Sequence, residues 1–164
     1  MKKFERVTHY HSIKLEYDTK IIRKSHDYRI YKDAILLTPG EWSDSITNSP
    51  IRYSAGALSK YSSNWTSKYL NLDHEWSVVN RIGMVEKPKF FNGKLMADLY
   101  INPITTNARD TIALIDADMI QHLSVELQSD DYWDSSDRIR CADNIEFIGC
   151  AVVTMPADLH TRIK

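Results

Sequence analysis

The hydrophobic pattern in the second half of the chain is strand-like except for one helical stretch, and this limits the folds that the chain can adopt. Runs rich in β-favouring residues lie at Leu70–Val79, Arg81–Glu86 and Lys94–Ile101. The dipeptide Asn92-Gly93 is typical of a two-residue hairpin turn. The sequence therefore predicts three successive strands, of which the last two form a hairpin.

The period then becomes helical. Between Asn107 and Ile120 the apolar residues recur three or four positions apart, and Thr105 or Thr106 can cap the first turn. This spacing predicts a helix of about four turns.

Strict alternation follows in the segment HLSVEL, at residues 122–127. Alternation places neighbouring side chains on opposite faces of a strand. One face should carry Leu123, Val125 and Leu127, and the other His122, Ser124 and Glu126.

Other strands are expected at 28–40, ending at Pro39-Gly40, and at Ile145–Thr154. The polar segment 41–68 should be mostly loop, with a short helix around Ala55–Tyr61. The acidic segment QSDDYWDSSDRIR, at residues 128–140, should also be a loop. Strands joined by hairpins and flanked by few helices indicate a mainly β, α+β fold. An antiparallel barrel or sandwich is favoured over a parallel sheet.

The chain has 164 residues, which fits one domain at 28–164 preceded by an arm or first strand at 1–27. A formal net charge of −1 gives no indication of a nucleic-acid or membrane partner. No secretory signal or transmembrane run is evident, so an intracellular setting is expected, with Cys141 and Cys150 as free thiols. The aspartates of the acidic segment lack the spacing of a calcium loop. We therefore expect no metal and no cofactor.

Ser124 and His74 are the candidate catalytic residues. Serine hydrolysis needs a hydroxyl, a base that removes its proton, a group that orients the base and donors for the oxyanion. Ser124 lies on the polar face of a predicted strand, and His74 lies within the predicted strand Leu70–Val79. Taken alone, a serine like Ser124 is more commonly a surface residue, and a histidine like His74 is more commonly a hydrogen-bonded core residue.

Three sequence blocks, in order, resemble the prohead (capsid-maturation) proteases of tailed phages, which share a fold with the herpesvirus assemblin proteases. The first block, LDHEWSVVNRIGMV, is similar to a motif with a histidine before an IG-x-V strand. The second, TTNARDTIALIDADMIQHLSVEL, is similar to a helix that leads into the nucleophile strand. The third, CAVVTMPADLHTRI, is similar to the closing strand. Together the blocks cover roughly residues 70–163.

The resemblance implies that Ser124 is the nucleophile and His74 the general base. It also implies an acidic side chain just before the position of Ala151, where this chain has Gly149. Glu146 is the nearby candidate for a third member, although it would face away unless a bulge intervenes. A Ser-His dyad without a third member is the alternative.

Arg138 and Arg140 occupy the part of the chain where the viral relatives carry an oxyanion-hole arginine. Their other interpretation is as counter-charges to the nearby aspartates.

The implied function is a virus-encoded serine endopeptidase with a β-barrel of the herpesvirus-protease type. It would cleave scaffold and capsid proteins, and possibly itself, inside the immature procapsid in the host cytoplasm. Self-association is a further possibility. One alternative is an inactive capsid-assembly module that retains the protease fold, and another is an unrelated β-barrel binding domain.

Overall fold

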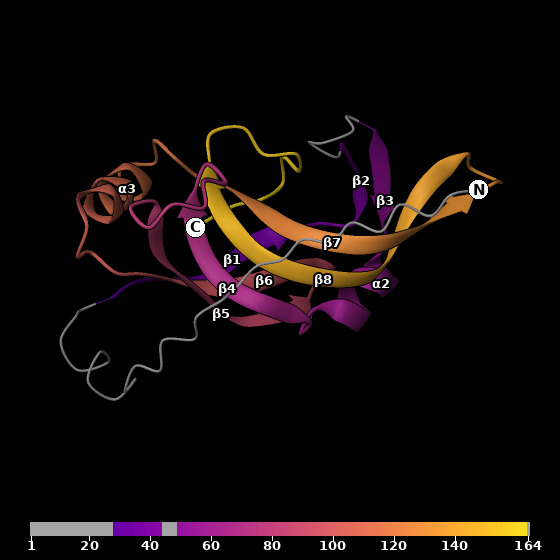
Figure 1. The fold of residues 1–164 in the computed structure, drawn as a ribbon, viewed down its shortest axis with the longest axis horizontal. Helices are drawn as coiled ribbons and strands as arrows, with labels where there is room; N and C mark the ends of the chain where they lie inside the picture. Colours follow the sequence, from indigo (N-terminus) through magenta and orange to yellow (C-terminus); the bar gives the residue numbers. More distant parts are fainter. Residues whose placement is uncertain (1–27, 44–48, 164) are drawn as a thin grey trace.

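The computed structural model describes residues 28–43 and 49–163, which form one curled sheet with two helices beside it (Figure 1). The elements in chain order are β1 (Arg29–Leu37), β2 (Gly40–Ser43), β3 (Pro50–Tyr53), α2 (Ala55–Tyr61), β4 (Trp65–Leu72), β5 (Arg81–Phe91), β6 (Lys94–Ile101), α3 (Thr106–Asp116), β7 (His122–Asp134) and β8 (Ile139–Val153). The expected mainly β fold with flanking helices is confirmed. The arm expected at 1–27 lies outside the described residues.

Strand β8 organises the sheet. The strand order is β1-β6-β5-β4-β8-β3-β2, and β7 pairs with the other edge of β8. β7 is antiparallel to β8, but β4 and β3 are both parallel to it. The expectation of a purely antiparallel sheet was therefore wrong. The described pairings leave an open path that ends at β1 and β2, so the sheet is curled but not shown as a closed barrel.

The expected hairpin and the expected helix are present. Asn92 and Gly93 both have positive φ, 49° and 73°, as a two-residue hairpin turn requires. Thr105 caps α3 by accepting a hydrogen bond from the backbone N–H of Ala108 at 3.1 Å. The helix ends at Asp116, four residues before the expected end, and the chain turns at Asp118 with a φ of 57°.

Two segments expected to be loops contain strands. The segment 41–68 holds most of β2, all of β3 and the start of β4, besides the expected helix α2. The acidic segment 128–140 contains the end of β7 and the start of β8, so its turn is limited to residues 135–138. Both faces of β7 are largely exposed beyond Gln128, so the alternation that would have revealed the strand is absent.

The core lies between the curled strands and includes Leu36, Leu99, Ile101, Ile145 and Phe147, each fully buried. Cys141 and Cys150 are buried free thiols, as expected. Among the described residues, no helix combines the length and hydropathy needed to cross a membrane.

Replacing Gly83 by alanine should destabilise the fold by about 2 to 3 kcal/mol, because overpacking a close backbone contact forces the strands apart. A Cβ at Gly83 would lie 2.1 Å from the carbonyl oxygen of Tyr100 on β6. Gly56→Ala in α2 is the matched control, since nothing lies closer than 3.9 Å to its Cβ position. Guanidinium unfolding curves should show a loss only for Gly83→Ala. Equal stability of the two variants would contradict the close approach of β5 and β6.

Cys150 should resist alkylation in the native protein. Burial first, and then the nearby charge of Glu126, raise the pKa of the Cys150 thiol and so disfavour the reactive thiolate. Iodoacetamide at pH 8, followed by peptide mass spectrometry, should modify Cys150 only after denaturation. Modification of Cys150 in the native protein at the rate of a solvent-exposed thiol would refute the burial.

Candidate active site

His74 lies in a turn and not in a strand, so the expected strand Leu70–Val79 was wrong beyond Leu72. β4 ends at Leu72, where the backbone N–H of Leu72 donates to the carbonyl of Asn80 at 3.0 Å. Asp73 and His74 then have φ values of 48° and 60°. This conformation is costly for residues with a side chain, and strained residues of this kind cluster at functional sites.

The His74 ring contacts a carboxylate. Its Nδ1 lies 2.9 Å from Oε1 of Glu126, a residue of β7. The Glu126 side chain is 12% exposed and that of His74 is 41% exposed. The second oxygen of Glu126, Oε2, is buried and has no hydrogen-bond partner among the described residues.

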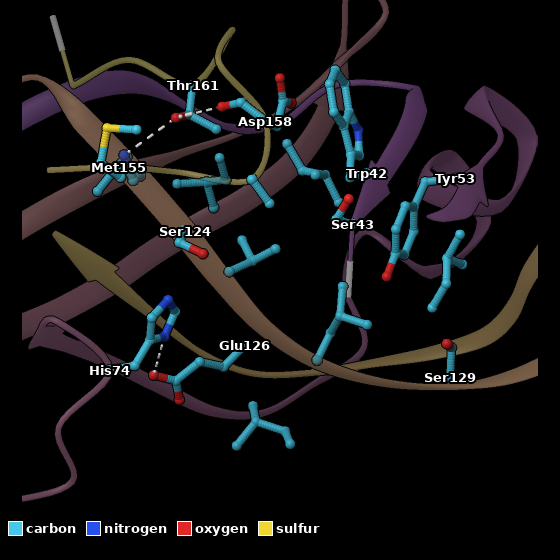
Figure 2. A pocket seen from close by; sticks show the side chains of 18 of the residues that line it. Trp42, Ser43, Tyr53, His74, Ser124, Glu126, Ser129, Met155, Asp158 and Thr161 are labelled. Carbon is cyan, nitrogen blue, oxygen red and sulfur yellow. Dashed lines mark hydrogen bonds and ion pairs between the residues drawn. The ribbon is translucent and has the colours of Figure 1, made fainter. Parts of the chain in front are cut away.

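Ser124 lies two residues before Glu126 on β7, and their partners on β8 are Ala151 and Gly149. Side chains two residues apart on a strand share a face. Figure 2 shows Ser124, Glu126 and His74 together, with the free nitrogen of His74 on the edge of the ring towards Ser124. Among the described residues no hydrogen bond joins Ser124 to His74; such bonds are often long in the absence of substrate.

The three side chains line one groove of about 800 Å³ that follows the free edge of β7. Across the groove lie Trp42 and Tyr53 (Figure 2), together with Ile51. This far wall is mainly apolar, so the groove combines a polar side at Ser124 with an apolar side opposite.

Among the described residues, the hydrogen bonds that cover the outer edge of β7 lie at the start of the strand. The backbone N–H of Leu123 donates to Oγ1 of Thr161 at 3.3 Å, and the N–H of Ile163 donates to the carbonyl of Gln121 at 2.9 Å. Because peptide groups alternate direction along a strand, those of Val125 and Leu127 also point to this edge. These groups therefore face the groove.

A buried carboxylate fixes the segment that follows β8. Asp158 is 2% exposed and accepts from the backbone N–H of Thr38 at 2.6 Å and from its hydroxyl at 2.8 Å. Asp158 also accepts from the backbone N–H of His160 at 2.8 Å. The Trp42 indole donates to the carbonyl of Thr38 at 2.9 Å. Asp158 thus joins the end of β1, the β2 tryptophan and the C-terminal segment into one wall of the groove.

The other expected site residues lie elsewhere. The carboxylate of Glu146 accepts a hydrogen bond from Thr66 on β4 and lines a separate pocket. Arg138 is in the turn between β7 and β8. Arg140 pairs with Asp131 and lies eleven positions before Ala151 on β8, a path of roughly 35 Å along a strand. Within the described residues, no cluster of side chains has the composition of a metal site.

Sequence reasoning missed Glu126 as the partner of His74, although alternation had placed it on the face of Ser124. It also missed the groove wall formed by Trp42, Tyr53 and Asp158. No local signal in the sequence identifies that wall, because its residues meet only through long-range packing.

Comparison with protein-family models gives no match, and comparison with curated proteins gives none either. Among solved structures, the chain is similar to the bacteriophage T4 capsid assembly protease gp21, with a TM-score of 0.49 and 10% sequence identity. The alignment covers 79% of this chain and 98% of that chain. This likeness is partial, and the function proposed below rests on the side chains of the groove and the sequence motifs.

Asp158→Asn should lower the free energy of unfolding by about 1.5 to 3 kcal/mol. The asparagine amide nitrogen cannot accept a hydrogen bond, so the donors of Thr38 or the backbone N–H of His160 would lose their acceptor. Asp110→Asn, on the exposed face of α3, is the control and should change stability by less than about 0.5 kcal/mol. Urea unfolding measures both. An Asp158→Asn protein with the free energy of unfolding of the wild type would contradict the hydrogen bonds described for this wall.

Proposed function

We propose that the chain is a virus-encoded serine endopeptidase of the prohead type, with Ser124 as the nucleophile and His74 as the general base. The observation that carries the proposal is the meeting of Ser124, His74 and Glu126 in one groove at an open strand edge. Glu126 occupies Nδ1 of His74, so Nε2 is the nitrogen left for the Ser124 hydroxyl. This polarity is the one that serine hydrolysis requires.

In the proposed mechanism, Nε2 of His74 accepts the Ser124 proton as the hydroxyl oxygen attacks the peptide carbonyl. The imidazolium then donates that proton to the departing amine, which leaves an acyl-enzyme. A water molecule, deprotonated by the same nitrogen, hydrolyses the ester and regenerates Ser124. No cofactor is required. Arg138 and Arg140 lie too far along the hairpin to take part in this mechanism.

The substrate proposed is an extended peptide. The peptide groups of Val125 and Leu127 face the groove, so a strand added there would be held through its main chain beside Ser124. Alternate side chains of that strand would meet the apolar wall at Ile51 and Tyr53. Main-chain recognition suits an enzyme that cuts exposed segments of several proteins.

The capsid setting of the proposal comes from the sequence motifs. In that setting the substrates are scaffold and capsid-protein segments, and the chain itself, inside an immature procapsid in the host cytoplasm. The competing function is an inactive capsid-assembly module. It is favoured by Gly149, which stands where an acidic residue was expected.

Ser124→Ala should abolish proteolysis without unfolding the protein, because only the nucleophile is removed. The wild type, Ser124→Ala and a control, Ser59→Ala on the exposed side of α2, are each co-expressed with candidate capsid and scaffold proteins. Intact masses report cleavage, and a fluorophosphonate probe, which loses fluoride as it forms a phosphonate ester with a nucleophilic serine, reports the reactivity of Ser124. We expect cleavage and labelling at Ser124 in the wild type and in Ser59→Ala only.

Cleavage that persists in a folded Ser124→Ala protein would refute the assigned nucleophile. A wild type that neither cleaves nor reacts with the probe, yet binds the capsid protein, would favour the assembly module.

A further inference from the structure

Glu126 has a role that follows from its position on the same strand as Ser124. We propose that Glu126 is the positioning carboxylate of the site, and that it replaces, from across the β7–β8 ladder, an acidic side chain that β8 lacks at Gly149. This inference rests on the proposed function and names a residue that determines how its base works.

The first support is the contact itself. A carboxylate can only accept hydrogen bonds, so Oε1 of Glu126 at 2.9 Å requires the proton of a neutral His74 ring to be on Nδ1. Nε2 then carries the lone pair that accepts the Ser124 proton. A ring with the opposite tautomer could not act as that base. Glu126 therefore selects the reactive form of His74 and also fixes the orientation of its ring.

The second support is the register of β7 and β8. Glu126 pairs directly with Gly149, and directly opposed residues have their Cβ positions about 5 Å apart on one face. A Cβ at Gly149 would lie 3.4 Å from Oε2 and 4.0 Å from the carboxylate carbon of Glu126. The Glu126 carboxylate thus lies over Gly149, in the space that a longer side chain on β8 would enter.

The third support is that nearby carboxylates have other partners. Glu75, in the turn beside His74, accepts from the amide of Asn80 at 2.5 Å. Glu146 accepts from Thr66, and Asp158 is bonded to Thr38 and His160. Glu126 is the carboxylate that contacts the ring.

A fourth observation concerns rigidity. Ser124 and Glu126 belong to a strand paired along its whole length with β8. His74 follows β4, and the backbone N–H of Asp73 donates to the carbonyl of Val152 on β8 at 3.1 Å. The segments that carry all three side chains are therefore hydrogen-bonded to β8, which keeps the carboxylate and the hydroxyl at fixed positions relative to the ring.

The test compares four variants of the 164-residue chain with the wild type: Glu126→Gln, Glu126→Ala, the double variant Glu126→Ala/Gly149→Glu, and the control Glu75→Gln. The measurements are the rate of Ser124 phosphonylation by a fluorophosphonate probe, and kcat and KM for a peptide that the wild type cleaves. Nitrogen-15 NMR of labelled histidine reports the His74 tautomer independently of activity. Circular dichroism verifies that each variant is folded.

We expect Glu126→Gln and Glu126→Ala to lower kcat and the phosphonylation rate on the order of 100-fold or more, with KM within about twofold. In Glu126→Ala the neutral His74 ring should shift its proton from Nδ1 towards Nε2. Glu75→Gln should remain within about threefold of the wild type in both rates. The double variant should be at least about tenfold more active than Glu126→Ala, because a carboxylate at position 149 reaches the same space.

A folded Glu126→Gln or Glu126→Ala protein with wild-type rates and an unchanged tautomer would overturn the positioning role. A folded double variant without recovery would overturn the exchange across the ladder. If the wild type itself never reacts with the probe or any peptide, the proposed function fails instead. The tautomer of His74 in Glu126→Ala would then still decide whether Glu126 orients the ring.

Discussion

Pairing with β8 is the constraint on which the arrangement of the site depends. Strand β8 is hydrogen-bonded to β7 along one edge and to β3 and β4 along the other, so three separate parts of the chain meet on one strand. The side chains of Ile145, Phe147 and Cys150 are fully buried beneath these pairings. Figure 1 shows the β7–β8 hairpin curving across the molecule, with α3 near one end and β2 and β3 towards the other. Loss of this register would separate Ser124, on β7, from His74, which follows β4.

The site combines a rigid strand with a strained turn. β7 supplies Ser124 and Glu126 at a spacing fixed by the strand geometry, while His74 is presented by a turn with positive φ. Such a backbone conformation persists only where the surrounding structure imposes it. Here the hydrogen bonds of Leu72 with Asn80 and of Asp73 with Val152 close the turn against β5 and β8. The histidine is thereby held beside a strand without being part of one.

The groove owes its shape to groups far from the candidate catalytic residues. Asp158 ties the segment after β8 to the end of β1, and Arg52 links β3 to Glu41 and to Asp137 at the tip of the β7–β8 hairpin. Charged bonds of this kind hold the apolar wall opposite the free edge of β7. An extended peptide would thus have a main-chain template on one side and an apolar surface on the other.

The sequence by itself determined the local elements whose side chains alternate between core and solvent. A period of 3.6 residues predicted the helix after Thr105, and a period of two predicted the strand that places Ser124 and Leu123 on opposite faces. The hairpin follows from the dipeptide Asn92-Gly93. The exposed end of β7 escaped prediction because neither of its faces is buried there. Only the tertiary structure decided that β4 runs parallel to β8, that His74 leaves the strand, and that Glu126 rather than Glu146 contacts its ring. These features depend on register between segments far apart in the chain, including the shift between Phe147 and Gly149, and no local pattern encodes such a register.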